Sequence, residues 1–215
     1  TRYGVQTLPI YADLAREGAA YELFACVGEL PVEVLVSNAG MLLFATLTHT
    51  PSSSLEKIIA LHCTTPTLLC RLFAEQMLRR GRGHIVLMSS ITAWTPYPTI
   101  SHYAATKAYL KSFADSLWCE LRQKGVSVTA VFPSAVDTPL YNLDAETRRW
   151  LRRCGLMLSA EEVARKALRA MHRGRRRCLP GFLTKVEAVL CYLLPTWIVL
   201  PIMKIPAVRR ILERI

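Results

Sequence analysis

The sequence contains no Cys-x-x-Cys pair, although seven cysteines are scattered over its 215 residues. Protein zinc and iron–sulfur sites depend on clustered thiolates, so we expect no metal centre. The cysteine count is odd and no secretory signal begins the chain, which favours a reduced cytosolic setting over a disulfide-stabilised secreted one. A chain of this length predicts one sizeable domain core.

Glycine-rich phosphate-binding turns are also absent. The ten glycines are dispersed, and neither Gly-x-Gly-x-x-Gly nor Thr-Gly-x-x-x-Gly-x-Gly occurs. Such a turn normally supplies the backbone N–H groups and the helix N-terminus that bind a dinucleotide's pyrophosphate. The sequence as written therefore carries no ordinary pyrophosphate cradle.

Acidic residues are scarce in one part of the chain, so its net charge of +11 is unevenly spread. The balance is −1 over residues 1–147, +9 over 148–177 and +3 over 178–215. Nucleic-acid binding favours basic residues interleaved with aromatic ones, but only Trp150 lies within the basic block. A basic block followed by an apolar tail indicates a membrane surface as the partner, and we expect no nucleic acid.

Extended and helical patterns alternate along the rest of the chain. The expected strands are short, β-branched and apolar, as in strands buried on both faces. The alternation predicts an α/β fold with a doubly wound, Rossmann-like parallel sheet. The expected strands are residues 6–12, 32–36, 84–88 and 126–132, and the expected helices are residues 13–30, 53–80 with a kink at Pro66, 101–124, a patch before Gly155, and one beginning at Ser159.

Three of the expected strands are each followed by a small polar motif. These motifs are residues 38–40, Ser89-Ser90 and residues 133–138. Because open α/β sheets bind ligands beyond the carboxyl ends of their strands, the three motifs predict one composite site.

Tyr103 and Lys107 are four residues apart in an expected helix, so their side chains share one face. A phenol with a pKa of about 10 exchanges protons poorly at neutral pH. An ammonium about 5 Å away, at an effective dielectric of about 20, contributes roughly 3 kcal/mol toward the phenolate. A second positive charge, such as an oxidised nicotinamide ring, would complete the shift. Ser90, thirteen residues before Tyr103, can hold a substrate oxygen beside the phenol.

Ser-Ser followed at this distance by Tyr-x-x-x-Lys resembles the active site of the short-chain dehydrogenase/reductase family. The resemblance implies an NAD(P)-dependent oxidoreductase, with NADP(H) slightly favoured, that interconverts a carbonyl and a secondary alcohol as a homodimer or homotetramer. It implies that Tyr103 is the general acid/base, Lys107 its pKa-lowering partner and Ser90 the oxygen holder. The implied cofactor-binding residues are Asp13, Asn38, Ala39, Gly40, Tyr103, Lys107, Pro133, Ser134, Val136 and Thr138.

Three of these cofactor assignments have simpler alternatives. Asp13 could be a helix N-cap, residues 38–40 a plain turn, and Thr138 a loop hydroxyl. Two positions also depart from the family pattern. His62 stands where the family has an asparagine that holds a water linking the lysine to solvent, and its alternative is a packing residue. Ser134 replaces a glycine and removes backbone freedom beside the nicotinamide.

The larger departure is that the family's first strand, its Gly-rich turn and its second strand have no counterpart. The resemblance spans roughly residues 5–180, so we predict an N-terminally incomplete domain over residues 1–181. The chain is either a fragment or a diverged protein that no longer binds cofactor in the ordinary way. The second alternative is a non-catalytic, membrane-associated interaction protein.

A hydrophobic, basic tail is expected over residues 182–215. Residues 186–205 are apolar apart from Glu187 and Lys204 and contain two prolines, which favours an interfacial hairpin or anchor over a straight spanning helix. The alternative is a helix folded over the substrate pocket or a partner subunit. We expect the protein at the cytoplasmic side of a membrane, or in the cytoplasm.

The segment between Ser90 and Tyr103 is expected to form one wall of a lipophilic substrate pocket. Residues 91–100 are mostly apolar and include the aromatic residues Trp94 and Tyr97. Together with the tail, this wall favours a bulky hydrophobic substrate such as a keto-acyl lipid, a long-chain base or a sterol.

Overall fold

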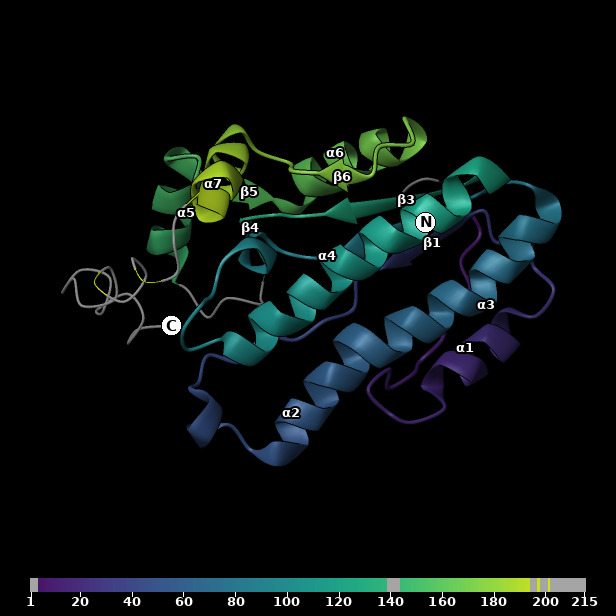
Figure 1. Cartoon of the computed structure of the whole chain (residues 1–215), viewed down its shortest axis with the longest axis horizontal. Coiled ribbons are helices and arrows are strands. Elements are labelled where there is room, and N and C mark those ends of the chain that lie inside the picture. The colour runs from purple at the N-terminus through teal and green to yellow at the C-terminus, as the bar shows by residue number, and fades with distance from the viewer. Residues whose placement is uncertain (1–3, 139–143, 194–196, 198–200, 202–215) are drawn as a thin grey trace.

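The computed structural model describes residues 4–138, 144–193, 197 and 201 (Figure 1). Within these residues the main sheet has the strand order β1-β2-β3-β6, and every neighbouring pair is parallel. The α/β fold with a parallel sheet predicted from the sequence is confirmed. The strands of this sheet are β1 (Val34–Ser37), β2 (Gly83–Met88), β3 (Val126–Val131) and β6 (Arg177–Cys178).

The α-helices of the described residues are α1 (Ala19–Val27), α2 (Ser52–Ile59), α3 (Thr65–Arg80), α4 (Ser101–Leu121), α5 (Ala145–Arg153), α6 (Ala160–His172) and α7 (Phe182–Leu193). They cover both faces of the sheet. Ile85 and Leu87 of β2 pack in one cluster with residues of α3 and α4. Val86, between them, packs with α6. Because successive side chains of a strand point to opposite faces, each central strand supplies both halves of the core.

The long helix expected at residues 53–80 is interrupted just before Pro66. A π-helical turn, η2 (Ala60–Thr64), joins α2 to α3. Proline has no N–H to bond the carbonyl of the fourth residue before it, which is His62, so the regular ladder opens there. The turn leaves the His62 side chain buried in the interior.

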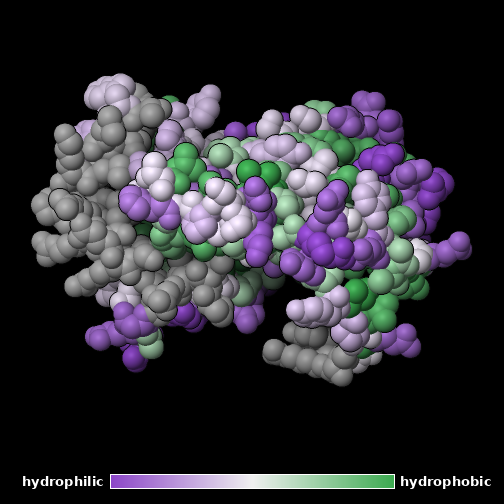
Figure 2. Space-filling view, turned by 90° about the horizontal axis from the view of Figure 1, so that it is seen from below, coloured by the Kyte–Doolittle hydropathy of each residue, from purple (hydrophilic) through white to green (hydrophobic). Residues whose placement is uncertain are grey.

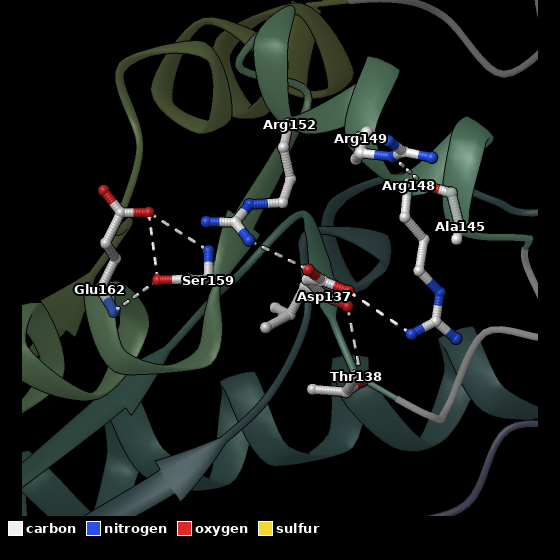
Figure 3. A network of polar contacts seen from close by, with 9 residues as sticks. Asp137, Thr138, Ala145, Arg148, Arg149, Arg152, Ser159 and Glu162 are labelled. Atoms are coloured by element: carbon white, nitrogen blue, oxygen red, sulfur yellow. Dashed lines mark hydrogen bonds and ion pairs between the residues drawn. The ribbon is translucent and has the colours of Figure 1, made fainter.

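The other expected central elements lie where the sequence places them. Strands at residues 32–36, 84–88 and 126–132 correspond to β1, β2 and β3, and the helix at 101–124 corresponds to α4 with a 3-10 turn, η4 (Arg122–Lys124). Gly125 ends this turn with φ +84°, a left-handed conformation that glycine adopts freely. Ser159 and Glu162 form the expected capping box at the start of α6 (Figure 3).

The N-terminal expectations were wrong in two respects. Residues 6–12 are largely exposed and do not form a strand. A strand needs a neighbour for its backbone hydrogen bonds, and among the described residues β1 pairs only with β2. The helix expected at 13–30 is limited to α1, because Gly18 and Gly28 hold left-handed φ angles at its two ends.

Several short elements carry no clear sequence signal. A two-stranded parallel sheet joins β4 (Ala135–Asp137) to β5 (Met157–Ser159) and lies beside α5 (Figure 1). The remaining 3-10 turns are η1 (Leu47–His49) and η3 (Ile91–Trp94). Hydrophobic side chains are exposed between hydrophilic ones on the face shown in Figure 2. No helix of the described residues is long and apolar enough to span a membrane.

Candidate functional site

A cavity of about 720 Å³ lies beyond the carboxyl ends of β1, β2 and β3. All three polar motifs contribute to its lining, as do two residues of α4 and His62. The residues that the sequence predicted and that line the cavity are Asn38, Ala39, Gly40, His62, Ser90, Tyr103, Lys107, Pro133, Ser134, Val136 and Thr138. The expected meeting of strand ends at one edge therefore forms a single hollow site.

Tyr103 and Lys107 lie one helical turn apart on the inner face of α4, and both are buried. The Lys107 Nζ atom lies 5.3 Å from the centroid of the Tyr103 ring. It donates a hydrogen bond of 2.9 Å to the Met88 carbonyl at the end of β2. In the other direction, the Ser89 hydroxyl donates to the Lys107 carbonyl at 2.8 Å. These two bonds fix the face of α4 that carries Tyr103 and Lys107 to the end of β2, just before Ser90.

Burial dominates the electrostatics of this pair. It raises the pKa of Tyr103 above its ordinary value, and the hydrogen bond with the Ser90 side chain opposes that rise. It also lowers the pKa of Lys107 to about 8. In the protein alone, burial therefore outweighs the groups that favour the phenolate, and the second positive charge named in the sequence analysis is still needed. The reason is that removing both groups from water disfavours both charged forms.

His62 is held by protein groups at both ring nitrogens. Its Nε2 atom accepts a hydrogen bond of 3.0 Å from the Met41 N–H, so the proton lies on Nδ1, which is 2.9 Å from the Thr106 hydroxyl. That hydroxyl donates onward to the Tyr103 carbonyl at 2.8 Å. The His62 and Tyr103 rings also meet edge to face, with centroids 5.6 Å apart.

This arrangement fixes the charge of His62 and explains one glycine. Burial, followed by the positive charge of Lys107, lowers the pKa of His62 to about 3. The ring is therefore neutral at physiological pH. A Cβ atom on Gly40 would lie 2.9 Å from His62 Nε2, so a side chain at position 40 would press on the ring.

The segment after β3 is bound to its neighbours on two sides. The Pro133 carbonyl accepts a hydrogen bond of 3.0 Å from the Ile91 N–H, just beyond Ser90. Asp137 of β4 forms ion pairs with Arg148 at 3.5 Å and Arg152 at 3.3 Å, both on α5 (Figure 3). The Thr138 hydroxyl bonds weakly to the Val136 carbonyl at 3.4 Å and also lines the cavity.

Three predicted site residues lie elsewhere. The Asp13 carboxylate accepts a hydrogen bond of 3.0 Å from the Ala15 N–H in an exposed turn and does not line the cavity. Trp94 and Tyr97 line a second, shallower hollow of about 550 Å³ instead. Trp94 packs edge to face on Phe132 of the core, at 5.5 Å between centroids. In a loop, unlike a helix or a strand, the spacing of residues does not determine which way their side chains point. The sequence therefore could not place these two rings.

The wall opposite Tyr103 was not foreseen. It consists of one stripe of α6, although the helical apolar spacing of that stripe was visible in the sequence. Its members are Ala160, Val163, Ala164, Ala167 and Leu168. No group of three or more His, Cys, Asp or Glu side chains in the described part of the chain is placed to hold a metal ion.

Comparison with known proteins agrees with this geometry. The family model described as short chain dehydrogenase matches residues 1–149. The 17-beta-hydroxysteroid dehydrogenase type 3 of Rattus norvegicus is 29% identical over 196 residues, which cover 90% of this chain and 61% of the rat protein. The present chain thus spans less than two thirds of that relative's length.

Solved structures share the fold. A 7beta-hydroxysteroid dehydrogenase superposes with a TM-score of 0.77 at 23% identity, over 87% of this chain and 73% of that one. A metagenomic short-chain oxidoreductase in complex with NADP has a TM-score of 0.58 at 30% identity, over 62% of this chain and 61% of that one. Because the family model covers more than half of the sequence, the chain belongs to the short-chain dehydrogenase family.

Proposed function

We propose that the protein is an NAD(P)-dependent oxidoreductase that interconverts a carbonyl and a secondary alcohol. The observation that carries the proposal is the burial of Tyr103, Lys107 and Ser90 around one cavity at the carboxyl edge of the sheet. In this proposal Ser90 orients the substrate oxygen and Tyr103 gives or takes its proton. Lys107 places a positive charge beside the phenol.

The cavity fits the nicotinamide end of a dinucleotide better than its pyrophosphate. Residues 38–40 and 133–138 offer backbone and small polar groups around Lys107, whereas no Gly-rich turn occurs in the sequence. Bound there, NAD(P)(H) would supply or accept the hydride. The NADP bound by the 30% identical metagenomic oxidoreductase supports a preference for NADP(H). Asp13 as a cofactor-binding residue remains a prediction.

The proposed substrate is bulky and lipophilic. The apolar stripe of α6 supports this, because it gives the cavity a hydrophobic wall opposite Tyr103. The name of the rat relative, a hydroxysteroid dehydrogenase, supports the same class. In this proposal the apolar stripe of α6, and not Trp94 and Tyr97, forms the hydrophobic wall of the substrate pocket.

We further propose that the protein associates with the cytoplasmic surface of a membrane through its C-terminal region. The support comes from α7, whose outward side chains are hydrophobic: Phe182 is 79% exposed and Val189 57% exposed. Exposed arginines lie on nearby α5, and the two helices approach where Gly155 faces Leu183. Residues 194–196, 198–200 and 202–215 of the expected tail lie outside the described residues. A homodimer or homotetramer remains a prediction.

The experiment that tests the activity is a spectrophotometric assay of NADPH and NADH oxidation, with each variant made in a longer polypeptide that carries a Gly-rich turn upstream. The ketones to be compared are ketosteroids, long-chain ketones and short ketones. Tyr103→Phe removes the transferable proton and should lower turnover by roughly 10²–10⁴-fold. Tyr21→Phe, an exposed tyrosine of α1, is the matched control and should leave turnover unchanged. Near-normal turnover in Tyr103→Phe would refute the mechanism. Absence of turnover combined with membrane binding would favour the non-catalytic alternative.

A further inference from the structure

Helix α7 turns its more polar face toward the protein and its hydrophobic face toward solvent. Its inward stripe holds Thr184, Glu187, Ala188 and Cys191, whereas its hydrophobic side chains point outward. Glu187 is the one acidic residue of this helix, and it lies half-buried on the inward side. A carboxylate withdrawn from water is costly unless other groups bond to it, so its partners indicate what the position does.

Glu187 contacts the cavity segment that follows β3. The Ser134 hydroxyl donates a hydrogen bond of 2.8 Å to Glu187 Oε2. Burial first and the Glu187 charge second raise the pKa of Tyr97, which places that phenol beside the same carboxylate. α7 also packs against η3, the turn that follows Ser90. The carboxylate therefore lies where α7, the segment of Tyr97 and the cavity segment 133–138 meet.

Ser134 is the side chain through which this contact can act on the site. It lines the cavity between Pro133, which is bonded to Ile91, and β4, which leads to Thr138. A serine at this position lets α7 hold the segment by a hydrogen bond. The acceptor is charged, and such bonds are stronger than neutral ones.

We propose that Glu187 is a positioning residue that holds residues 133–138 at the cavity through Ser134, which makes α7 a part of the site. The role in catalysis rests on the proposed function, because residues 133–138 are its cofactor contacts. The contact itself does not rest on it, and the two can be tested separately.

The contact is tested by hydrogen–deuterium exchange on the full chain. Glu187→Ala should speed exchange of residues 134–138 and of α7 by about tenfold, the effect of losing a hydrogen bond to a charged group. Glu187→Gln keeps a carbonyl acceptor and should restore most of the protection. Ser134→Ala should produce the same change as Glu187→Ala, and the double variant should add nothing further.

Two controls make the exchange result decisive. Glu120→Gln removes an exposed carboxylate of α4 and should change neither segment, and peptides of α3 should exchange equally in every variant if the fold is intact. Unchanged exchange of residues 134–138 in Glu187→Ala would overturn the proposal. So would additive effects of the Ser134 and Glu187 substitutions.

The functional consequence is a split between KM and kcat. Loosening residues 133–138 weakens cofactor binding in the ground state and the transition state alike, so Glu187→Ala should raise the KM for NADPH several-fold with kcat nearly unchanged. Glu187→Gln should restore it. These kinetics are measured in a longer polypeptide that carries a Gly-rich turn upstream. If neither that protein nor its variants turn over, the proposed function fails, while the exchange result still decides the contact. A fall in kcat alone would overturn the positioning role.

Discussion

Lys107 illustrates a conflict between stability and function at a single residue. Its ammonium lies almost fully buried and donates a hydrogen bond to the Met88 carbonyl, and within the described part of the chain it forms no ion pair with a carboxylate. The pKa lowered to about 8 means that the folded state holds this charge at a cost. Between pH 8 and its ordinary pKa of 10.5, the unfolded chain binds a proton that the folded chain lacks, so this term adds stability as pH rises.

Replacement by a neutral side chain should therefore stabilise the fold and damage the site. We expect Lys107→Met to raise the free energy of unfolding at pH 7 by about 1–3 kcal/mol, less what is lost by leaving the Met88 carbonyl unpaired. Urea titration at pH 7 and pH 9.5 measures this, and the gain should shrink at the higher pH. Turnover should fall sharply. A destabilised variant at pH 7 would show that the ammonium contributes to stability.

His62 predicts a pH dependence of the same sign in a lower pH range. The folded protein keeps the ring neutral down to a pKa of about 3, whereas the unfolded chain binds a proton near pH 6.5. The stability that comes from this difference is complete above pH 6.5 and is lost as pH falls toward 3, at about 1.4 kcal/mol per pH unit. His62→Asn should lose less stability than the natural protein between pH 6.5 and 4.5 in urea titrations. Parallel curves would contradict the buried neutral ring.

The water-relay hypothesis for His62 is tested by a different pair of variants. His62→Leu leaves the Met41 N–H and the Thr106 hydroxyl without their partner and should cost about 1–3 kcal/mol of stability. A relay also requires that His62→Asn keep activity near neutral pH while His62→Leu loses it. Because both ring nitrogens have protein partners, a relay water would have to replace one of these bonds. Equal turnover of the two variants would leave His62 a packing residue.

Local spacing explains which site residues could be predicted. Tyr103 and Lys107 follow from a four-residue helical interval, and Ser90 follows from the end of an apolar strand, so short-range rules suffice. Glu187 could not be found this way. Its partner, Ser134, is 53 positions away, and the sequence marks Glu187 only as a charge in an apolar stretch.

At the scale of elements, a strand could be predicted where its own residues show that it is buried in a sheet. It could not be predicted where it forms only because a neighbouring strand offers hydrogen bonds. The buried strands β2 and β3 could be predicted because their residues are mostly β-branched or apolar. The two-residue strand β6 and the pair β4–β5 form only because a neighbouring edge offers hydrogen bonds, and three residues carry too little periodicity to show it. The strand predicted at residues 6–12 is absent because this strand-like segment has no neighbouring strand to bond with among the described residues.

Helix α7 carries the membrane prediction. We expect the full chain to sediment with vesicles containing phosphatidylserine and to lose this binding when residues 182–215 are deleted. The double variant Phe182→Asp/Val189→Asp should bind about thirtyfold less or weaker still, because both side chains are exposed and their burial in lipid contributes about 1 kcal/mol or more each. High salt should release the natural protein only partly, since apolar burial is not screened.

The matched control lies at the other end of the chain. Leu8→Asp/Tyr11→Asp adds the same two negative charges at residues that are both exposed and should leave vesicle binding unchanged. A full-length protein that stays soluble and monodisperse without detergent or lipid would contradict membrane association.

The excess positive charge and the residues proposed for the reaction lie in different parts of the molecule. The excess of positive charge lies in residues 148–177, which include α5 and α6, while the balance over residues 1–147 is −1. The cavity lies between these parts, with α4 on one side and α6 on the other. If the protein binds an anionic surface through α5 and α7, the positive charge lies at that surface and the proposed acid/base residues of α4 lie in the near-neutral part of the chain.

The same view of the whole molecule shows what a bound dinucleotide would lack. The described chain offers groups for the nicotinamide end, but no Gly-rich turn for the pyrophosphate. Strand β1 is an edge of the sheet within the described residues, and Val36 on it is 50% exposed. Two further strands placed beside β1 that covered roughly 300 Å² of this apolar surface would add about 7 kcal/mol to the free energy of unfolding. The conformational entropy lost in ordering those strands would be subtracted from this figure.

We therefore expect the 215-residue polypeptide by itself to bind NADPH and NADH weakly or not at all, and to turn over correspondingly little. Much of a dinucleotide's binding free energy should come from its pyrophosphate and adenosine, and their usual contacts are the backbone N–H groups of a Gly-rich turn. The measurement is fluorescence titration and thermal shift with both cofactors, on this polypeptide and on a longer one that carries such a turn upstream. Binding should stabilise the longer form by an amount that grows with cofactor concentration. Micromolar binding with clear stabilisation of the 215-residue form would show that the cavity holds the cofactor without that turn.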